Sequence, residues 1–129
     1  MFTILVVEDT QIVREPLARL LKGEGYHVLS AADGAEANEH LAGRDVDLIL
    51  LDVLMPHMHG IAFLEMLRAD PRHKDVAVIG LTGVTDTSRL ARLRELGVKS
   101  IVHKVRFTFD GLLEEIRLHL PVGEHAGSR

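Results

Sequence analysis

The sequence predicts an α/β fold: a single doubly wound domain with a five-stranded parallel sheet and helices on both faces. Short aliphatic runs alternate five times with longer segments whose apolar residues recur at helical spacing. The runs at 4–7 and 48–51 are uninterrupted, as in strands buried on both faces of a parallel sheet. The five expected strands lie at 4–7, 26–30, 48–51, 76–81 and 100–103.

Helical patterns occupy the segments between and after these runs. The first helix is expected to begin after Thr10 as its N-cap and to end at Gly23 and Gly25, with a kink at Pro16. Its apolar face is expected to contain Val13, Leu17, Leu20 and Leu21. The second is expected at 34–41.

The last three helices follow the same logic. A loop containing Pro56 and Gly60 leads to the third, which ends at Asp70-Pro71. The fourth is expected at 86–96, closed by Gly97. The apolar positions that mark these three helices are Ile61, Leu64 and Leu67, then Leu90, Leu93 and Leu96, then Leu112, Leu113, Ile116 and Leu120.

Composition limits the classes of function. With 129 residues, 47% apolar and 26% charged, the chain is expected to form one globular domain, 1–121, followed by a polar tail, 122–129. The absence of cysteine excludes disulfides and thiol chemistry, and suits the cytoplasm. A net charge of −4 argues against nucleic-acid binding, and no apolar run is long enough to span a membrane. Six of the eight histidines are scattered and are expected at the surface.

Carboxylate, hydroxyl and ammonium side chains directly follow four of the expected strands. Glu8 and Asp9 follow the first, Asp52 the third, Thr82 the fourth and Lys104 the fifth. Parallel strands bring their carboxyl ends to one edge of the sheet, where sites of open α/β folds form. We therefore expect these side chains to converge there.

Carboxylates gathered in this way repel one another unless a cation joins them. Mg²⁺ prefers oxygen ligands and is usually held by one or two carboxylates together with water. We expect Asp9 and Asp52 to bind it directly and Glu8 to act through a water molecule. The backbone carbonyl of Leu54 is a further candidate ligand.

The same residue types suit phosphoryl transfer to a carboxylate. Asp52 can attack phosphorus and form an acyl phosphate. Lys104 can neutralise a phosphoryl oxygen in flight, and the hydroxyl of Thr82 can hydrogen-bond the arrived group. The added charge can then bias a two-state element of the fold.

With these residues in place, the chain resembles the receiver domains of two-component response regulators over residues 3–120. The stretch 50–60, LLDVLMPHMHG, matches the family pattern D-x-x-M-P-x-x-x-G. The resemblance implies a flavodoxin-like fold, Asp52 as the phosphoacceptor, and a sensor histidine kinase or phosphotransfer protein as the phosphate donor. It also implies output to a downstream protein through the fourth helix, fifth strand and fifth helix, a face that allows phosphorylation-dependent dimers.

Two departures from the family pattern keep an alternative open. Val105 follows Lys104 where the family usually has a cis-proline, and we expect a trans bond there. Ile101 stands where the family often has an aromatic ring that turns inward on activation. A phosphorylation-independent interaction module of the same fold is therefore the main alternative.

Two other functions are disfavoured. A Mg²⁺-dependent phosphohydrolase is disfavoured because Leu54 stands where such enzymes place a second aspartate. A flavin-binding flavodoxin is disfavoured because the loop after the first strand is acidic rather than a glycine-rich phosphate cradle. The sequence leaves open whether the chain acts alone or is part of a longer protein.

Overall fold

The computed structural model describes residues 1–55, 58–83, 87–104 and 107–120. The helices are α1 (Gln11–Gly23), α2 (Gly34–Gly43), α3 (Gly60–Ala69), α4 (Thr87–Glu95) and α5 (Phe109–His119). The main strands are β1 (Thr3–Val7), β2 (His27–Ala31), β3 (Leu48–Asp52), β6 (Ala77–Thr82) and β7 (Val98–His103). Two short strands, β4 (Leu54–Met55) and β5 (Met58–His59), pair separately.

The main strands form one parallel sheet in the order β2-β1-β3-β6-β7. The chain moves from β1 outward to β2 and then returns to pair β3 on the other side of β1. The strand order therefore switches direction between β1 and β3, which is where open α/β folds place their sites. The predicted fold class is confirmed.

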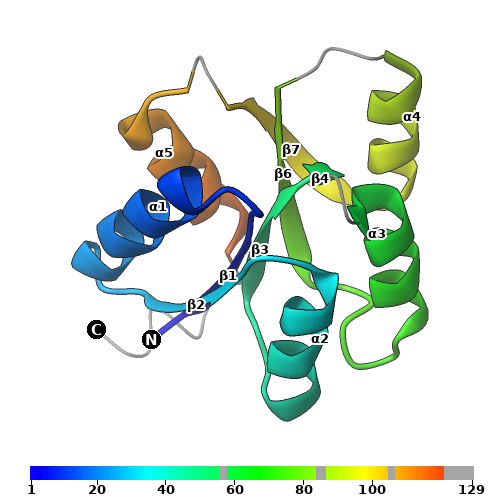
Figure 1. Ribbon diagram of the computed structural model, residues 1–129, viewed down its shortest axis with the longest axis horizontal. Coiled ribbons are helices and arrows are strands. Elements are labelled where there is room, and N and C mark those ends of the chain that lie inside the picture. Colours follow the sequence, from blue (N-terminus) through cyan, green and yellow to red (C-terminus); the bar gives the residue numbers. More distant parts are fainter. Residues whose placement is uncertain (56–57, 84–86, 105–106, 121–129) are drawn as a thin grey trace.

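Helices cover both faces of the sheet (Figure 1). α1 and α5 lie on one face, and α2, α3 and α4 lie on the other. Successive residues of the central strands belong to different cores: Ile4 and Val6 pack toward α1 and α5, while Leu5 and Val7 pack toward the opposite helices. Burial on both faces explains why these strands are continuous aliphatic runs.

The structure corrects several details of the predicted elements. β7 begins at Val98, two residues before the expected start. The expected loop after β3 contains the antiparallel pair β4–β5. Leu20, expected on the apolar face of α1, is 46% exposed, because it lines an open hollow beside Phe107 and Phe109 and is not enclosed in the core. His73, expected at the surface with the other scattered histidines, is buried.

The first helix spans the expected segment, from the residue after Thr10 to Gly23. α1 continues through Pro16, an exposed position, because Leu17, Ala18 and Leu21 anchor the helix in the core. Thr10 occupies the N-cap position but makes no side-chain capping bond. By contrast, Asp33 caps α2 by accepting from Glu36 N, and Thr108 caps α5 by accepting from Gly111 N.

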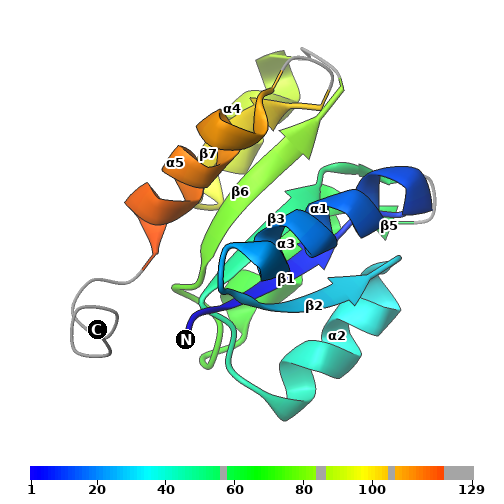
Figure 2. The ribbon, with the colours of Figure 1, turned by 90° about the vertical axis from the view of Figure 1, so that its left-hand side faces the viewer.

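Seen from the side, the sheet twists between its two layers of helices (Figure 2). None of the helices in the described ranges combines the length and the apolar character needed to cross a membrane. Pro56, Val105, Pro121 and the expected tail at 122–129 lie outside the described residues.

Candidate functional site

The acidic pair predicted from the sequence follows β1 directly. The Glu8 amide continues the sheet by donating to Ala31 O at 3.0 Å. The Glu8 side chain is fully buried, and its Oε2 accepts from Thr10 N at 3.0 Å. Asp9 is half-buried. The turn from β1 into α1 therefore holds one carboxylate inside the protein and leaves the next partly accessible.

The end of β3 brings a third carboxylate to the same edge. Asp52 is its last residue and is 2% exposed. Carboxylate oxygens of Glu8, Asp9 and Asp52 all lie within 4.8 Å of one another. Parallel pairing of β1 with β3 produces this convergence, because both strands end at the same edge of the sheet.

Lys104 supplies a positive charge to this group. Its ammonium lies 2.8 Å from Glu8 Oε1 and 3.2 Å from Asp52 Oδ2, so it bridges two buried carboxylates from different strands. The Lys104 side chain is 21% exposed, which leaves it reachable from solvent. Lys104 neutralises one of the three negative charges, so the group of three carboxylates and one ammonium keeps a net negative charge.

Thr82 and Lys104 are placed next to each other through the backbone. The backbone amide of Lys104, the residue after β7, donates at 2.8 Å to the carbonyl of Thr82, the last residue of β6. Thr82 is buried, and the neighbouring Leu81 is in register with Asp52 across the β3–β6 pair. The hydroxyl-bearing residue, the lysine and the buried aspartate therefore lie on adjacent strand ends, as the sequence predicts.

Burial and the neighbouring charges have opposite effects on the pKa of Glu8, and likewise on the pKa of Lys104. Burial raises the pKa of the Glu8 carboxyl, and the bonds from Lys104 and Thr10 only partly counter it. Burial alone would lower the pKa of Lys104, but its bonds to Glu8 and Asp52 outweigh this and raise it. Lys104 is therefore a firmly protonated cation at neutral pH.

The donor set fits a hard divalent cation. Three carboxylates within 4.8 Å, two of them buried, supply the oxygen ligands that Mg²⁺ prefers and a net negative charge that attracts it. The predicted carbonyl ligand, Leu54, begins β4 two residues after Asp52. The role of its carbonyl stays a prediction.

A close backbone contact shapes the segment after Asp52. A Cβ atom on Gly60 would lie 2.7 Å from Val53 Cα and 2.9 Å from Val53 O. Val53 N in turn donates to Leu81 O at 3.0 Å. Glycine at position 60 therefore lets the start of α3 press against the residue that follows Asp52. This gives a physical reason for the last position of the D-x-x-M-P-x-x-x-G pattern.

Arg14 is a residue to which sequence reasoning assigned no role. Its Nη1 donates to the backbone carbonyls of Glu8 at 2.7 Å and Asp9 at 3.3 Å. Its position in the sequence is the signal that could have indicated this contact. A residue at the end of the first turn of α1 can reach back to the turn that precedes the helix.

Comparisons with known proteins agree with this geometry. Residues 4–117 match the family model of the response regulator receiver domain. Among curated relatives, the CAI-1 autoinducer sensor kinase/phosphatase CqsS of Vibrio cholerae is 34% identical over 102 residues, which are 78% of this chain and 15% of that protein. The DNA-binding response regulator MtrA of Mycolicibacterium smegmatis is 37% identical over 101 residues, which are 78% of this chain and 43% of that protein. The chain thus spans less than half the length of either relative.

Solved structures show the same likeness. The chemotaxis protein CheY4 of Vibrio cholerae superposes with a TM-score of 0.87 at 29% identity, over 93% of this chain and 99% of that chain. The signal receiver domain of a signal transduction histidine kinase from Syntrophus aciditrophicus has a TM-score of 0.82 at 32% identity, over 93% of this chain and 90% of that one. The chain therefore belongs to the receiver domain family of two-component response regulators.

Proposed function

We propose that this chain is a phosphorylation switch that accepts a phosphoryl group on Asp52 in a Mg²⁺-dependent reaction. The observation that carries the proposal is the contact of Lys104 with a 2% exposed Asp52, within 4.8 Å of two further carboxylates. The family to which the chain belongs supports the same function.

In the proposed reaction a carboxylate oxygen of Asp52 bonds to the phosphorus of the donor. The phosphorus–nitrogen bond of a phosphohistidine breaks, and its electron pair returns to the donor imidazole. The product is an acyl phosphate. Lys104 moves its ammonium toward a phosphoryl oxygen, and the Thr82 hydroxyl donates to another.

Bound Mg²⁺ would supply Lewis-acid stabilisation of the transferring oxygens. Asp9 and Asp52 would hold it directly and Glu8 through a water molecule, with the Leu54 carbonyl as a further ligand. The close contact between Gly60 and Val53 supports this assignment, because it fixes the backbone immediately after Asp52.

The proposed output is a change in protein contacts. The donor would be a sensor histidine kinase or a phosphotransfer protein in the cytoplasm, and the downstream partner would bind the face formed by α4, β7 and α5. Phosphorylation-dependent dimers through the same face are a further outcome to test. The chain would catalyse its own phosphorylation and dephosphorylation without turning over a separate small substrate.

The deciding experiment is intact-mass spectrometry after incubation with acetyl phosphate, with and without Mg²⁺. We expect one added phosphoryl group in the wild type that requires Mg²⁺ and is absent from Asp52→Asn. Asp45→Asn is the matched control, because Asp45 is an exposed carboxylate paired with Arg72 away from the site. Mg²⁺ binding without any added mass in the wild type would overturn the proposal and favour the phosphorylation-independent interaction module.

A further inference from the structure

The guanidinium of Arg14 binds the backbone of the turn that carries Glu8 and Asp9, on the peptide side and away from their carboxylates. Arg14 lies in α1, and its Nη1 donates to the carbonyls of both Glu8 and Asp9. These are the residues that carry two of the three carboxylates within 4.8 Å. Arg14 therefore contacts the peptide units that present the carboxylates and binds neither carboxylate itself.

The two acidic residues depend on this contact to different degrees. Glu8 has three further anchors, since its amide donates to Ala31 O, its Oε2 accepts from Thr10 N and its Oε1 contacts the ammonium of Lys104. The Asp9 carboxylate meets the Thr10 hydroxyl at 3.5 Å, which is at the limit for a hydrogen bond. The position of Asp9 thus rests largely on its backbone, and Arg14 is bonded to that backbone.

We propose that Arg14 is a positioning residue for divalent-cation binding, and that it acts by fixing the turn that carries Glu8 and Asp9. This rests on the function proposed above. Groups that orient metal ligands without touching the metal commonly change metal affinity by about 10–100-fold when they are removed. The bonds from Arg14 give the turn the same kind of support.

Electrostatics alone predicts the opposite result. A positive charge near a cation site repels the cation, so its removal should tighten Mg²⁺ binding. The sign of the change in affinity therefore separates a positioning role from a mere charge effect. A loss of affinity on removing a nearby positive charge requires that geometry outweighs repulsion.

The test compares Arg14→Gln and Arg14→Lys with the wild type. Mg²⁺ affinity is measured by titration followed through backbone amide chemical shifts, a readout independent of phosphorylation. We expect about tenfold weaker Mg²⁺ binding for Arg14→Gln. Arg14→Lys, which keeps a cationic donor, should lose less. Faster hydrogen exchange at the amides of residues 8–10 should accompany the loss in the metal-free protein.

Arg19→Gln is the matched control, because Arg19 is an exposed arginine on the same helix. It removes the same charge and should leave Mg²⁺ affinity unchanged or slightly tighter. Unfolding midpoints identify any variant whose loss reflects general destabilisation. If Arg14→Gln does not fold, Arg14→Met, which removes the donor but keeps an unbranched side chain, takes its place: weaker binding supports the proposal, and wild-type affinity overturns it.

The outcomes separate the two proposals. Wild-type affinity, or tighter binding, in a folded Arg14→Gln overturns the positioning role and leaves the phosphorylation switch intact. A wild type that binds no Mg²⁺ overturns both. A third outcome is that the wild type binds Mg²⁺ but is never phosphorylated, while Arg14→Gln binds Mg²⁺ more weakly than the wild type. This outcome supports the positioning role of Arg14 and overturns only the phosphorylation switch.

Discussion

The ammonium of Lys104 lies 2.8 Å from Oε1 of Glu8, a fully buried carboxylate 96 residues earlier in the chain. The same ammonium contacts Asp52 at 3.2 Å. In the metal-free protein Lys104 therefore provides the positive charge that the buried carboxylates need. This arrangement links the stability of the fold to the chemistry proposed for its site.

Removing the Lys104 charge should destabilise the metal-free protein. In Lys104→Met, Glu8 and Asp52 stay buried without their cation. We expect the free energy of unfolding to fall by about 2 kcal/mol, less than for a fully buried pair because the lysine is partly exposed. Saturating Mg²⁺ should restore part of this loss, since the ion binds the same carboxylates in the folded state. Urea unfolding with and without Mg²⁺ measures both effects.

Lys99→Met is the control for this variant. Lys99 lies on β7, the strand that Lys104 directly follows, but Lys99 is exposed. It should change stability little, with or without Mg²⁺. Equal losses in the two variants, or a loss in Lys104→Met that Mg²⁺ does not alter, would contradict the role assigned to the bridge.

The contact between Gly60 and Val53 predicts a steric effect on the site. In Gly60→Ala the new Cβ would meet Val53 backbone atoms at 2.7 and 2.9 Å, so the backbone must shift. We expect a loss of about 1–3 kcal/mol in stability, the usual range for overpacking. Phosphorylation by acetyl phosphate should also slow, because Val53 adjoins Asp52. Gly43→Ala is the control, because a Cβ at Gly43 has no atom within 4 Å. A Gly60→Ala protein as stable and as reactive as Gly43→Ala would refute this account.

Arg68 connects the carboxyl end of α3 to two other loops. Its guanidinium donates to the carbonyls of Val76 at 2.8 Å, Lys74 at 3.0 Å and Leu96 at 2.8 Å. Burial lowers the pKa of Arg68, with Asp75 opposing that effect. Lysine cannot reproduce the planar fork that reaches all three carbonyls. We therefore expect Arg68→Lys to cost about 2 kcal/mol, because the carbonyls of Val76 and Leu96, two half-buried residues, lose a charged donor.

Arg92→Lys provides the comparison for Arg68. Arg92 pairs with Glu65 at 2.7 Å, but both side chains are substantially exposed. Exposed ion pairs contribute about 0–1 kcal/mol, so this variant should stay near wild type in denaturant unfolding. Comparable losses in the two arginine variants would show that the carbonyl contacts of Arg68 add nothing beyond its charge.

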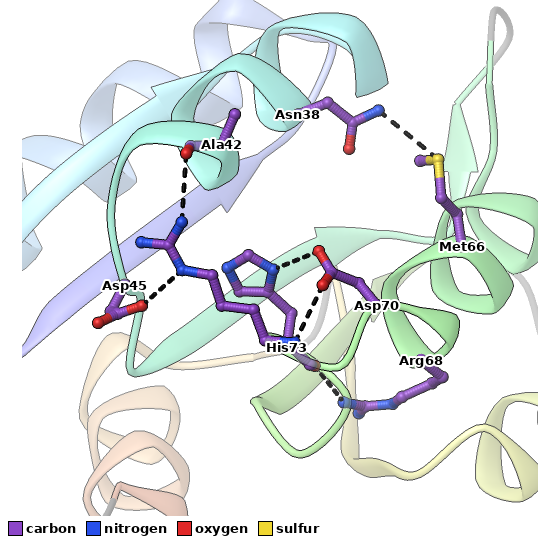
Figure 3. Close-up of polar contacts among 8 residues, drawn as sticks. Asn38, Ala42, Asp45, Met66, Arg68, Asp70 and His73 are labelled. Carbon is purple, nitrogen blue, oxygen red and sulfur yellow. Dashed lines mark hydrogen bonds and ion pairs between the residues drawn. The ribbon is translucent and has the colours of Figure 1, made fainter.

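A buried histidine creates a pH-dependent contribution to stability. His73 is 3% exposed, and its Nδ1 lies 2.9 Å from Asp70 Oδ2 (Figure 3). The hydrogen bond from His73, followed by that from the Arg72 amide, lowers the pKa of Asp70 below its ordinary value of 3.8. A carboxyl whose pKa is lower in the folded state adds stability above the ordinary value, and that stability is lost as pH falls through the folded pKa.

Asp70→Asn should remove this contribution. We expect the wild type to have a higher free energy of unfolding than Asp70→Asn, with the largest difference above about pH 5. This difference should decrease below about pH 4. Urea unfolding across this range measures it. Glu39→Gln, which removes an exposed carboxylate on α2, is the control and should show a smaller gap. A gap for Asp70→Asn that stays constant with pH would rule out the lowered pKa as its cause.

Aliphatic runs and helical periodicity along the chain are sufficient to predict the fold class and to place five polar side chains at one edge of the sheet. Uninterrupted aliphatic runs identify strands buried on both faces, and the positions directly after them identify Glu8, Asp9, Asp52, Thr82 and Lys104. These inferences hold because periodicity and strand ends are local properties of the chain. The pattern does not fix element boundaries: β7 starts earlier than predicted, and the predicted loop after β3 contains the β4–β5 pair.

Which groups contact one another depends on the packing of the folded domain. The bridge from Lys104 to Glu8, the donation from Arg14 to the acidic turn and the burial of His73 depend on where distant elements pack. The contact of Gly60 with Val53 depends on the path of the backbone between them. Spacing along the chain carries little information about such contacts, because sheet register and helix packing fix them only once the whole domain is assembled.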